Sequence, residues 1–459
     1  MNLPLPENLL NSLQGIAGFN RESFEQTHRD PGQVTSVRFN PLKSLREEFR
    51  FGESARVPWT SAGFYLAGRP RFTLDPFFHA GCYYVQEASS MFLEQAIRQT
   101  TDLSKPLRAL DLCAAPGGKS TLIQSVLSPE SLLVCNELLK TRVTILYENL
   151  VKWGAGNIVI TNNDPRDFSA LEHYFDLILV DAPCSGSGLF RREPELAGDW
   201  NERQVELCSL RQKRIIADIW PALKENGRLI YSTCSYSKEE NEEILDWMGD
   251  NWAVRSLPLS LENDWGIIPA YSPRKGFSGY RFYPDRLKGE GLFMAVIEKK
   301  EGGGFTLPKT RKNSIELLNK RERELLNPWT TDQQEPLTFF KHRDQVHGIP
   351  GCFLPDLPLL QQVLYLRKAG IAIGKLQTQE LIPNHELAMS VILNPSLPAM
   401  ALSSEQALTY LRREELRSAA PQMGWLRATH ENVNLGWIKN LPQRINNYYP
   451  MEWRILQKS

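Results

Sequence analysis

Short apolar runs alternate with longer amphipathic segments from residue 107 to about residue 300, and this alternation limits the possible folds more than any other feature. Strands joined by helical crossovers form a doubly wound, parallel α/β sheet, so we predict that fold class. The predicted strands are 107–113, 131–137, 157–164, 175–183 and 227–235, and helical spacing is clearest in 119–127, 139–154 and 201–227. A later apolar run, 291–300, predicts one more strand, which would close the sheet and could run antiparallel to its neighbour.

The alternation is absent from residues 1 to about 90 and from 305–459. A chain of 459 residues has room for two to four domains, each with its own core. Three consecutive glycines, Gly302–Gly304, precede the basic stretch Lys309–Arg323 and indicate a domain boundary.

Charge is balanced over the whole chain, because 53 basic residues face 53 acidic ones. Overall charge therefore gives no argument for a polyanionic partner. Local excess is present in Lys309–Arg323, with six basic and two acidic residues, and in Lys439–Lys458, with four basic and one acidic. Each stretch is interpreted either as a solvated helix or tail, or as a nucleic-acid contact.

The seven cysteines are odd in number and include no C-x-x-C pair. This pattern indicates neither a disulfide framework nor a zinc site, so no metal is expected and a reducing cytoplasm fits best. The N-terminal segment lacks a signal peptide's basic and apolar regions, and no apolar run reaches membrane-spanning length. We therefore predict a soluble, cytoplasmic protein without a membrane partner.

A glycine-bearing turn, Asp111–Lys119, follows the first predicted strand. It matches neither G-x-G-x-x-G nor a Walker motif, but its glycines would let the main chain approach a ligand at the carboxyl ends of the strands. Glu137 ends the second strand, where it would accept hydrogen bonds from a ribose diol, and Asp164 near the end of the third suits an adenine amino group. These features favour a nucleoside-containing cofactor, although such a glycine turn is often only structural.

Two cysteines follow the fourth and fifth strands, in Asp-Ala-Pro-Cys (181–184) and Ser-Thr-Cys (232–234), so we expect both at the same edge of the sheet. A free cysteine is most often a small buried apolar residue. Asp181, at a strand end beside the expected cofactor, favours a functional interpretation. Ser237 and Glu240 have the spacing of a capping box, which predicts a helix start just after Cys234.

Three motifs, DLCAAPGGKS, VDAPCSGSG and YSTCSYSKEENE, resemble those of Sun-type RNA cytosine-C5 methyltransferases in order and interval. The segments 37–43, 83–91 and 279–299 resemble flanking parts of that family. More loosely, 366–376 and 435–454 are similar to the C-terminal part of the bacterial F-type ribosomal RNA enzymes, which ends in a PUA-like module.

The resemblance implies a Rossmann-like S-adenosylmethionine (SAM) methyltransferase core with an N-terminal α+β, RRM-like extension and a C-terminal α+β, PUA-like RNA-binding region. The implied domains are 1–90 (N-terminal RNA-binding extension), 91–300 (catalytic), 301–395 (intermediate) and 396–459 (PUA-like). The implied cofactor is SAM, bound by Cys113, Ala114, Ala115, Pro116, Gly117, Gly118, Lys119, Glu137, Asp164 and Asp181.

The chemistry explains why such an enzyme needs a thiol. C5 of cytosine is too weak a nucleophile for direct methylation, and a thiolate adding at C6 activates it. Asp181 at N3 would stabilise the developing charge. DNA cytosine methyltransferases use the Pro-Cys thiol, which would nominate Cys184. The Sun-type resemblance instead implies that Cys234 attacks, that Cys184 helps release the product and that Lys119 positions Asp181 and the base.

The target base must be single-stranded or flipped out, since a stacked cytosine does not present C6 to a thiol. The resemblance implies small-subunit (16S) ribosomal RNA as substrate, free or in the subunit, and a monomeric enzyme. A transfer RNA methyltransferase is one alternative. A non-catalytic ribosome assembly factor is another, but it predicts loss of at least one of Lys119, Asp181, Cys184 and Cys234, all of which are present. The C-terminal aromatics Trp437, Tyr448, Tyr449 and Trp453 suit base stacking, but we expect most of them in a small core.

Overall fold

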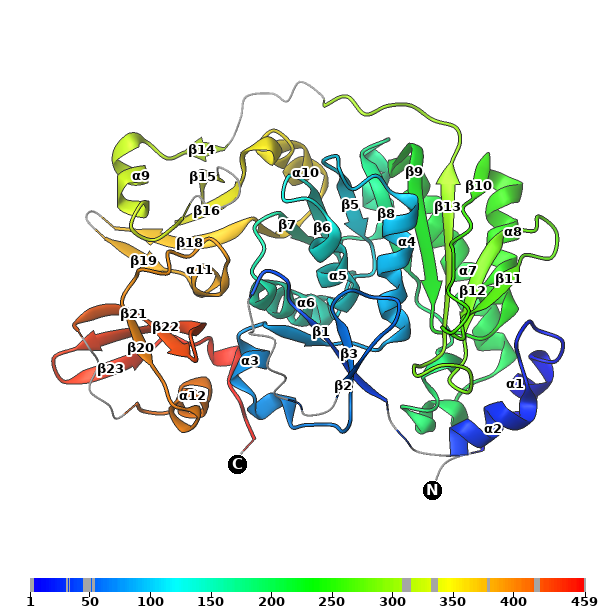
Figure 1. The fold of residues 1–459 in the computed structure, drawn as a ribbon. Coiled ribbons are helices and arrows are strands. Elements are labelled where there is room, and N and C mark those ends of the chain that lie inside the picture. The colour runs from blue at the N-terminus through cyan, green and yellow to red at the C-terminus, as the bar shows by residue number, and fades with distance from the viewer. Residues whose placement is uncertain are drawn as a thin grey trace.

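A ten-stranded sheet forms the centre of the computed structural model, and its parallel part has the strand order β7-β6-β5-β8-β9 (Figure 1). The structure describes residues 4–29, 32, 34–43, 51, 54–307, 315–331, 337–377, 380–416 and 422–457. The parallel strands are β5 (Arg108–Asp111), β6 (Leu132–Asn136), β7 (Ile158–Thr161), β8 (Phe175–Asp181) and β9 (Leu223–Thr233). The predicted parallel α/β sheet is confirmed, with most strands ending earlier than predicted.

Antiparallel strands complete one side of this sheet. β13 (Leu292–Lys299) pairs antiparallel with β9, which confirms the prediction that the run 291–300 closes the sheet. β12 (Ser278–Phe282) and β11 (Ile268–Tyr271) follow outward, and β10 (Val254–Ser256) also pairs with β13.

Helices cover both faces of the sheet, as a doubly wound fold requires. α5 (Gly118–Val126), α6 (Lys140–Trp153) and α7 (Glu202–Ile219) are crossovers, while α4 (Leu93–Thr100) precedes β5 and α8 (Glu242–Asn251) follows β9. Alternate residues of a strand enter different cores: Ala109 lies in one apolar cluster and Leu110 in the other.

The predicted helix over 201–227 is wrong in its last eight residues, because α7 ends at Ile219. A 3-10 turn, Trp220–Ala222, follows α7, and residues 223–226 already belong to β9. Pro221 has no amide hydrogen and so ends the helical hydrogen bonding. Lys224 then pairs with Asp176 of the neighbouring strand, with Nζ 2.5 Å from Oδ1.

The N-terminal extension is α+β, as predicted. Its antiparallel sheet has the order β2-β3-β1-β4, formed by β2 (Ser54–Arg56), β3 (Gly63–Leu66), β1 (Thr35–Phe39) and β4 (Tyr83–Val85). The helices are α1 (Glu7–Ser12), α2 (Arg21–Arg29) and α3 (Pro76–His79). Phe24 of α2 packs edge-on against Tyr236, with 5.1 Å between ring centroids, so this extension contacts the segment after β9.

Two further sheets lie in the C-terminal part of the chain. One contains β14 (Glu316–Leu317), β15 (Leu337–His342), β16 (Gln345–Pro350), β18 (Ile371–Leu376) and β19 (Leu381–Pro383), with helices α9 (Lys320–Leu326), α10 (Leu357–Val363) and α11 (His385–Met389). The other contains β20 (Ala399–Ala401), β21 (Gly424–His430), β22 (Val433–Leu441) and β23 (Arg444–Asn447), with helix α12 (Ser404–Leu411).

The C-terminal part is joined to the central sheet by a strand that the sequence did not predict. β17 (Leu366–Ala369) pairs antiparallel with β7 and forms the edge of the ten-stranded sheet. Beside it, the buried carboxylate of Asp356 accepts hydrogen bonds from Arg108 Nε at 2.8 Å and Tyr174 Oη at 2.7 Å. The two parts of the chain therefore share hydrogen bonds and buried charge.

The N-terminal sheet and the last sheet share one apolar core, which contains Phe77 and Tyr83 together with Leu426 and Tyr449. The last sheet lies at the lower left of the molecule and the N-terminal sheet at its lower centre, with α3 between them (Figure 1). Trp437 and Tyr449 are each 1% exposed, which confirms the expected core role for these two aromatics. Tyr448 is 41% exposed, and Trp453 is half-buried.

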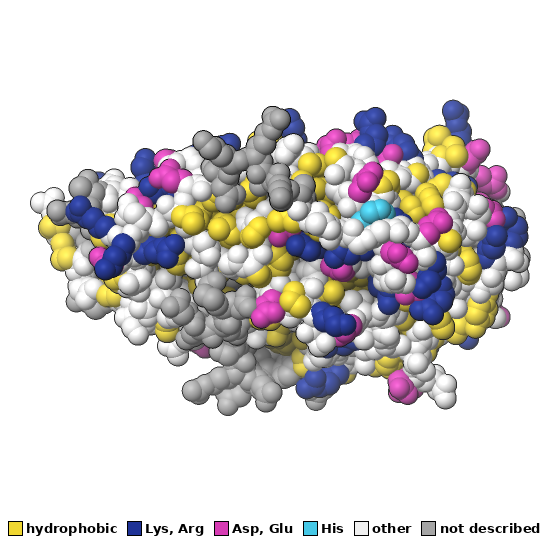
Figure 2. Space-filling model, turned by 90° about the horizontal axis from the view of Figure 1, so that it is seen from above, with side chains coloured by type: hydrophobic (Ala, Val, Ile, Leu, Met, Phe, Trp, Pro, Cys, Tyr) yellow, Lys and Arg dark blue, Asp and Glu magenta, His cyan; other side chains and the backbone are white. Residues whose placement is uncertain are grey.

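The face seen from above mixes lysine and arginine with aspartate and glutamate, and no single sign of charge dominates it (Figure 2). Residues 309–314 of the basic stretch Lys309–Arg323, and Lys458 of the other basic stretch, lie outside the described residues. Among the residues that are described, no helix is both long and apolar enough to cross a bilayer.

Candidate active site

The carboxyl ends of the parallel strands bring the predicted site residues to one edge of the sheet. Asp111 ends β5, Asp181 ends β8 and Cys234 directly follows β9. Strand order reverses between β5 and β8, and ligands of open α/β sheets bind at such a switch point. The turn after β5 and the two cysteine loops therefore face a common space.

The glycine turn after β5 is held by side chains from the next crossover. Arg142 Nη2 donates to the carbonyl of Ala115 at 2.5 Å, and Asn149 Nδ2 donates to that of Pro116 at 2.8 Å. Gly117 has φ of +114°, which a residue with Cβ rarely adopts. The turn thus keeps its main chain close to the strand ends.

Two carboxylates at the strand ends have oxygens that accept no hydrogen bond from the described residues. Glu137 Oε1 accepts from the amide of Leu139 at 2.9 Å, whereas Oε2 lies 3.4 Å from Arg142 Nη1 and lacks a hydrogen-bond donor. Asp111 Oδ2 accepts from Ser120 Oγ at 2.6 Å, and its Oδ1 has no donor. Both residues are buried, so each leaves an acceptor available to a bound ligand.

Burial raises the pKa of Asp111 from its ordinary value of 3.8 to about 7, although the Ser120 hydroxyl opposes the change.

Asp164, three residues after β7, accepts hydrogen bonds from the amide and Nε of Arg166, each at 3.1 Å. Asp164 is therefore at the same edge, with its carboxylate turned partly toward Arg166.

Asp181 has both carboxylate oxygens fixed. Lys119 Nζ donates to Oδ2 at 2.7 Å, and Ser232 Oγ donates to Oδ1 at 2.7 Å. Burial alone would lower the pKa of Lys119, but the Asp181 carboxylate raises it, so the ammonium stays charged. Lys119 comes from α5, the helix after β5, whereas Asp181 ends β8 and Ser232 lies in β9. Lys119 and Ser232 together orient the Asp181 carboxylate beside the cysteines.

The two cysteines of the site are in contact, with 2.9 Å between Cys184 Sγ and Cys234 Sγ. Both side chains are partly exposed. The hydrogen bond with Cys234, together with burial, raises the pKa of Cys184 well above its ordinary value. Cys184 therefore keeps its proton at neutral pH. The described residues include no cluster of three or more His, Cys, Asp or Glu that could bind a metal ion.

The predicted capping box at Ser237 and Glu240 is wrong. Ser237 makes no capping hydrogen bond, and α8 begins only at Glu242. The Glu240 carboxylate turns inward and accepts hydrogen bonds from the residue after each cysteine: from Ser185 N at 2.9 Å and Oγ at 2.5 Å, and from Ser235 Oγ at 2.6 Å. The buried carboxylate thereby links the two cysteine loops.

Three family models match successive parts of the chain. The model described as 16S rRNA methyltransferase RsmB/F matches residues 100–298, the N-terminal domain of 16S rRNA methyltransferase RsmF matches 5–88, and the RsmF PUA domain matches 397–455. The matches occur in the same order as the sheets described above. The chain belongs to the RsmB/F family.

Relatives named ribosomal RNA small subunit methyltransferase F match almost the whole chain. The relative from Shewanella woodyi is 29% identical over 91% of this chain and 90% of its own length. The relative from Pectobacterium atrosepticum is 28% identical over 98% of this chain and 95% of its own.

Solved structures share the fold of this RsmB/F-family chain. A methyltransferase homolog from Pyrococcus horikoshii is 28% identical, with a TM-score of 0.51, over 64% of this chain and 100% of its own. NSun6 from the same organism, solved with SFG, has a TM-score of 0.53 at 21% identity, over 65% of this chain and 99% of its own.

The RsmB/F-family motifs therefore bring Lys119, Asp181, Cys184 and Cys234 together at the end of the sheet, with Glu137 and Asp164 at the same edge. Four contributors were missed from the sequence: Asp111, Ser232, Glu240 and Asn136, whose Nδ2 donates to Leu112 O and Asn163 O, each at 3.1 Å. Asp111 lies in the motif DLCAAPGGKS and Ser232 in YSTCSYSKEENE, so their positions at strand ends could have identified them as site residues. Glu240 gave a misleading one.

Proposed function

We propose that this protein transfers a methyl group from SAM to C5 of a cytosine in small-subunit ribosomal RNA through a covalent bond between Cys234 and C6. The observation that carries the proposal is the meeting of two thiols and a fixed carboxylate at the switch point of the sheet: Cys184 and Cys234 are 2.9 Å apart, and Asp181 is held by Lys119 and Ser232. The relatives' names support ribosomal RNA over transfer RNA.

The residues around the switch point fit SAM. Glu137 Oε2 and Asp111 Oδ1, which have no hydrogen-bond donor among the described residues, suit the hydroxyl and ammonium donors of such a ligand, and Gly117 keeps a Cβ out of the turn. We assign the binding surface to the turn Cys113–Lys119 with Glu137, Asp164 and Asp181. SAM supplies the methyl group as an electrophilic sulfonium substituent. The chain's own residues must activate the base.

Activation begins at Cys234. Its thiolate adds to C6 of the cytosine, which forms a sulfur–carbon bond and moves the C5–C6 π electrons toward N3 and C5. Asp181 faces N3, where a shared proton stabilises the developing charge, and Lys119 keeps the carboxylate in place. C5, now enamine-like, accepts the methyl group. Loss of the C5 proton then returns the electrons to the C5–C6 bond as the bond to Cys234 breaks.

Cys184 is assigned to the release step. Its raised pKa supports a neutral thiol, which lies within hydrogen-bonding distance of the Cys234 sulfur. Because Cys184 Sγ is 2.9 Å from Cys234 Sγ, a base bonded to Cys234 through C6 would also have C5 and C6 beside the Cys184 thiol during product release. This division of roles is the one implied by the Thr-Cys and Pro-Cys motifs.

The target nucleotide must enter this space as an unstacked base. We assign RNA binding to the extension 1–90 and the PUA-like region 396–459, catalysis to 91–300 and a connecting role to 301–395. We also propose that the enzyme acts as a cytoplasmic monomer, on free RNA or on the subunit.

The test compares Cys184→Ala and Cys234→Ala variants, each incubated with SAM and small-subunit ribosomal RNA and then denatured. We expect Cys184→Ala to accumulate a denaturant-resistant protein–RNA adduct, because release is blocked after attack. Cys234→Ala should give neither adduct nor methylated cytosine. The reverse pattern would refute the assignment of the two thiols, and absence of methylation by the unaltered protein on any RNA would refute the proposed activity.

A further inference from the structure

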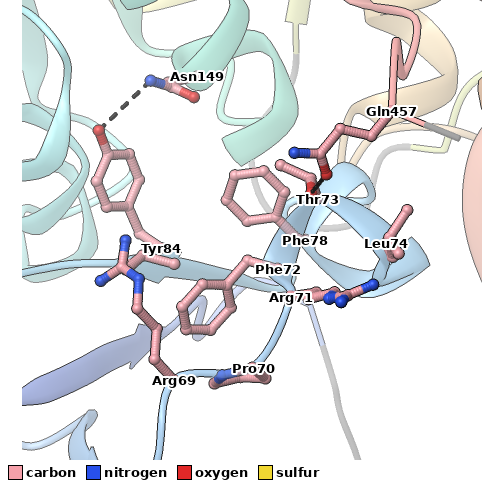
Figure 3. Close-up of a pocket in the computed structure, with 11 residues that line it drawn as sticks. Arg69, Pro70, Arg71, Phe72, Thr73, Leu74, Phe78, Tyr84, Asn149 and Gln457 are labelled. Atoms are coloured by element: carbon pink, nitrogen blue, oxygen red, sulfur yellow. Dashed lines mark hydrogen bonds between the residues drawn. The ribbon is translucent and has the colours of Figure 1, made fainter. Parts of the chain in front are cut away.

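A cavity of about 870 Å³ lies between the N-terminal sheet, α6 and the C-terminal tail. Its walls include Tyr84, Phe72 and Phe78, with Arg69 beside Tyr84, and Gln457 approaches from the tail (Figure 3). Gln457 Oε1 accepts a hydrogen bond from Thr73 Oγ1 at 3.0 Å. Aromatic and basic side chains of residues 69–84 therefore line one space together with an amide side chain from α6 and one from the C-terminal tail.

The cavity contacts the catalytic domain through Asn149. Asn149 Nδ2 lies 3.4 Å from Tyr84 Oη and 2.8 Å from the carbonyl of Pro116 in the glycine turn (Figure 3). A Cβ on Gly118 would lie 3.2 Å from the Tyr84 ring. The cavity is thus built against the back of the turn to which cofactor binding is assigned.

A second hollow, of about 270 Å³, adjoins this cavity, because Arg69 and Val85 line both. The second hollow is also lined by Arg192 and Glu290. Glu290 precedes Gly291, whose amide donates to Gly188 O at 3.1 Å, and Gly188 N donates to the carbonyl of Cys234 at 2.8 Å. The two hollows, which we call the β4 groove, follow the edge strand β4 from the catalytic loop to the C-terminal tail.

Positive charge is available in the β4 groove. Arg69 and Arg71 are exposed, and neither forms an ion pair within the described part of the chain; the Arg69 guanidinium lies 6.0 Å from the centre of the Phe72 ring. The acidic Glu290 is neutralised by Arg191 at 2.8 Å. Glu87 is occupied by main-chain amides, including that of Ser89 at 2.8 Å.

We propose that the β4 groove binds the single-stranded RNA that flanks the target nucleotide, with phosphates at Arg69 and Arg71 and a base against Tyr84, Phe72 and Phe78. Arginines suit phosphate contacts, and aromatic rings bind the faces of any base. A cavity of this size can hold a nucleotide. The inference rests on the proposed methylation of RNA and adds a path for the strand outside the catalytic space.

The first test measures binding of the twelve-residue RNA oligo(U) to the full chain across a range of salt concentrations. This probe contains no cytosine, so binding is separated from methylation. Arg69→Gln with Arg71→Gln removes two phosphate contacts, each contributing about 0.7 to the slope of log K against log salt, so the slope should fall by roughly 1.4 and Kd at 0.1 M salt should rise about 25-fold.

The matched control is Lys105→Gln with Lys300→Gln, which removes the same charge at the amino-terminal edge of the sheet. Lys105 is 74% exposed and pairs with Asp102, and Lys300 is 39% exposed and pairs with Glu298. The control should keep the oligo(U) affinity of the unaltered protein. Equal loss of affinity in the control and the groove variant, no loss in the groove variant, or no binding of oligo(U) by the unaltered protein would overturn the proposal.

A second test locates the strand directly. Oligo(U) carrying 4-thiouridine is crosslinked to the unaltered protein by light, and the attached peptides are sequenced by mass spectrometry. Crosslinks within residues 69–84 support the proposal, and crosslinks confined to other segments overturn it. If no RNA is methylated but these crosslinks and the effect of the arginine substitutions persist, the proposed activity fails while the β4 groove stands.

Discussion

Replacing Glu240 by alanine should separate the two cysteine loops and so abolish adduct formation before it abolishes folding. The buried carboxylate accepts four hydrogen bonds: from Ser185 N and Oγ, from Ser235 Oγ and from Gln212 Nε2 at 3.0 Å. The substitution therefore removes the carboxylate that accepts hydrogen bonds from both cysteine loops. The two loops would then be joined by the contact between the Ser185 and Ser235 hydroxyls and by the hydrogen bond from Gly188 N to Cys234 O, without the shared carboxylate.

The cost to stability follows from which donors keep a partner. Gln212 Nε2 also donates to Pro183 O at 3.1 Å, and the two serine hydroxyls lie 3.2 Å apart, so one can donate to the other. The amide of Ser185 and one hydroxyl are left over. A buried donor without an acceptor costs about 1–3 kcal/mol, so the free energy of unfolding should fall by about 2–6 kcal/mol.

Glu240→Gln is the conservative comparison. Its amide oxygen can still accept from Ser185 N and Gln212, while its NH2 group can donate to hydroxyls that turn to accept. The free energy of unfolding should fall by only about 1 kcal/mol. Burial raises the pKa of Glu240 despite the hydrogen bonds from Ser185 and Ser235, so removing its charge releases a desolvation cost that offsets part of the loss.

The assay combines urea denaturation with single-turnover methylation and adduct yield. We expect Glu240→Ala to lose roughly 100-fold in methylation rate, the effect of a misplacement of about 1 Å in a reacting group, and Glu240→Gln to stay near the unaltered rate. Glu94→Ala is the matched control, since that buried carboxylate also accepts from a hydroxyl, Thr60 Oγ1 at 2.6 Å, and an amide, Ser61 N at 3.1 Å, but lies on α4, outside both cysteine loops.

Glu94→Ala should be destabilised to a similar degree yet keep its methylation rate below its unfolding transition. Full methylation activity in Glu240→Ala would refute the anchoring role. A comparable loss of rate in Glu94→Ala would show that lowered stability, rather than loop position, slows the reaction.

Three other perturbations have defined outcomes. In the folded protein the pKa of Asp111 is raised from 3.8 to about 7, so the stability it contributes is fully present below pH 3.8 and is lost as pH rises through about 7. Asp111→Asn should remove this loss and gain up to about 4 kcal/mol at pH 8 relative to the unaltered protein, as urea midpoints from pH 4 to pH 8 would show; parallel profiles contradict it. Lys119→Met should lower the methylation rate at least about tenfold because Asp181 is no longer held in place. The melting temperature should change little because the Lys119–Asp181 pair is partly exposed. An unchanged rate in a single-turnover assay would contradict this role of Lys119. Asp356→Ala leaves Arg108 without its buried partner and should lower the free energy of unfolding by about 3 kcal/mol while kcat is retained. An unchanged melting temperature would contradict a stabilising role for the Arg108–Asp356 ion pair.

The sequence predicted the parallel sheet and the meeting of Cys184, Cys234, Asp181 and Lys119 because strand ends of a doubly wound sheet converge whatever the loops do. Runs of buried residues are visible in a sequence, and so are the positions that follow them. The start of β9 was wrong because helical spacing continues past Pro221, and only the proline and the pairing of Lys224 with Asp176 end the helix.

Long-range pairing escaped prediction for a different reason. β17 adds to β7 from more than two hundred residues away, and nothing local in 366–369 specifies that partner. Glu240 was assigned to a capping box because its spacing from Ser237 fits one. In the folded chain its carboxylate instead accepts hydrogen bonds from residues that include Ser185 and Gln212, both distant in sequence, which spacing alone does not reveal. Two serines and a glutamine from separate segments outcompeted the local amide.

The N-terminal extension and the glycine turn form one packed unit, which bears on how RNA and cofactor can cooperate. Arg38 of β1 is 1% exposed and donates to Thr121 Oγ1 at 2.5 Å and to Gly118 O at 3.4 Å. Burial lowers the pKa of Arg38 to about 9, so the guanidinium is charged at neutral pH and binds both acceptors strongly. A strand held in the β4 groove is therefore positioned relative to the turn by a buried charge rather than by a flexible linker. Balanced overall charge is then no obstacle to the proposed RNA binding, since a fixed groove whose Arg69 and Arg71 form no ion pair within the described residues needs no long-range attraction to set the register of the target base.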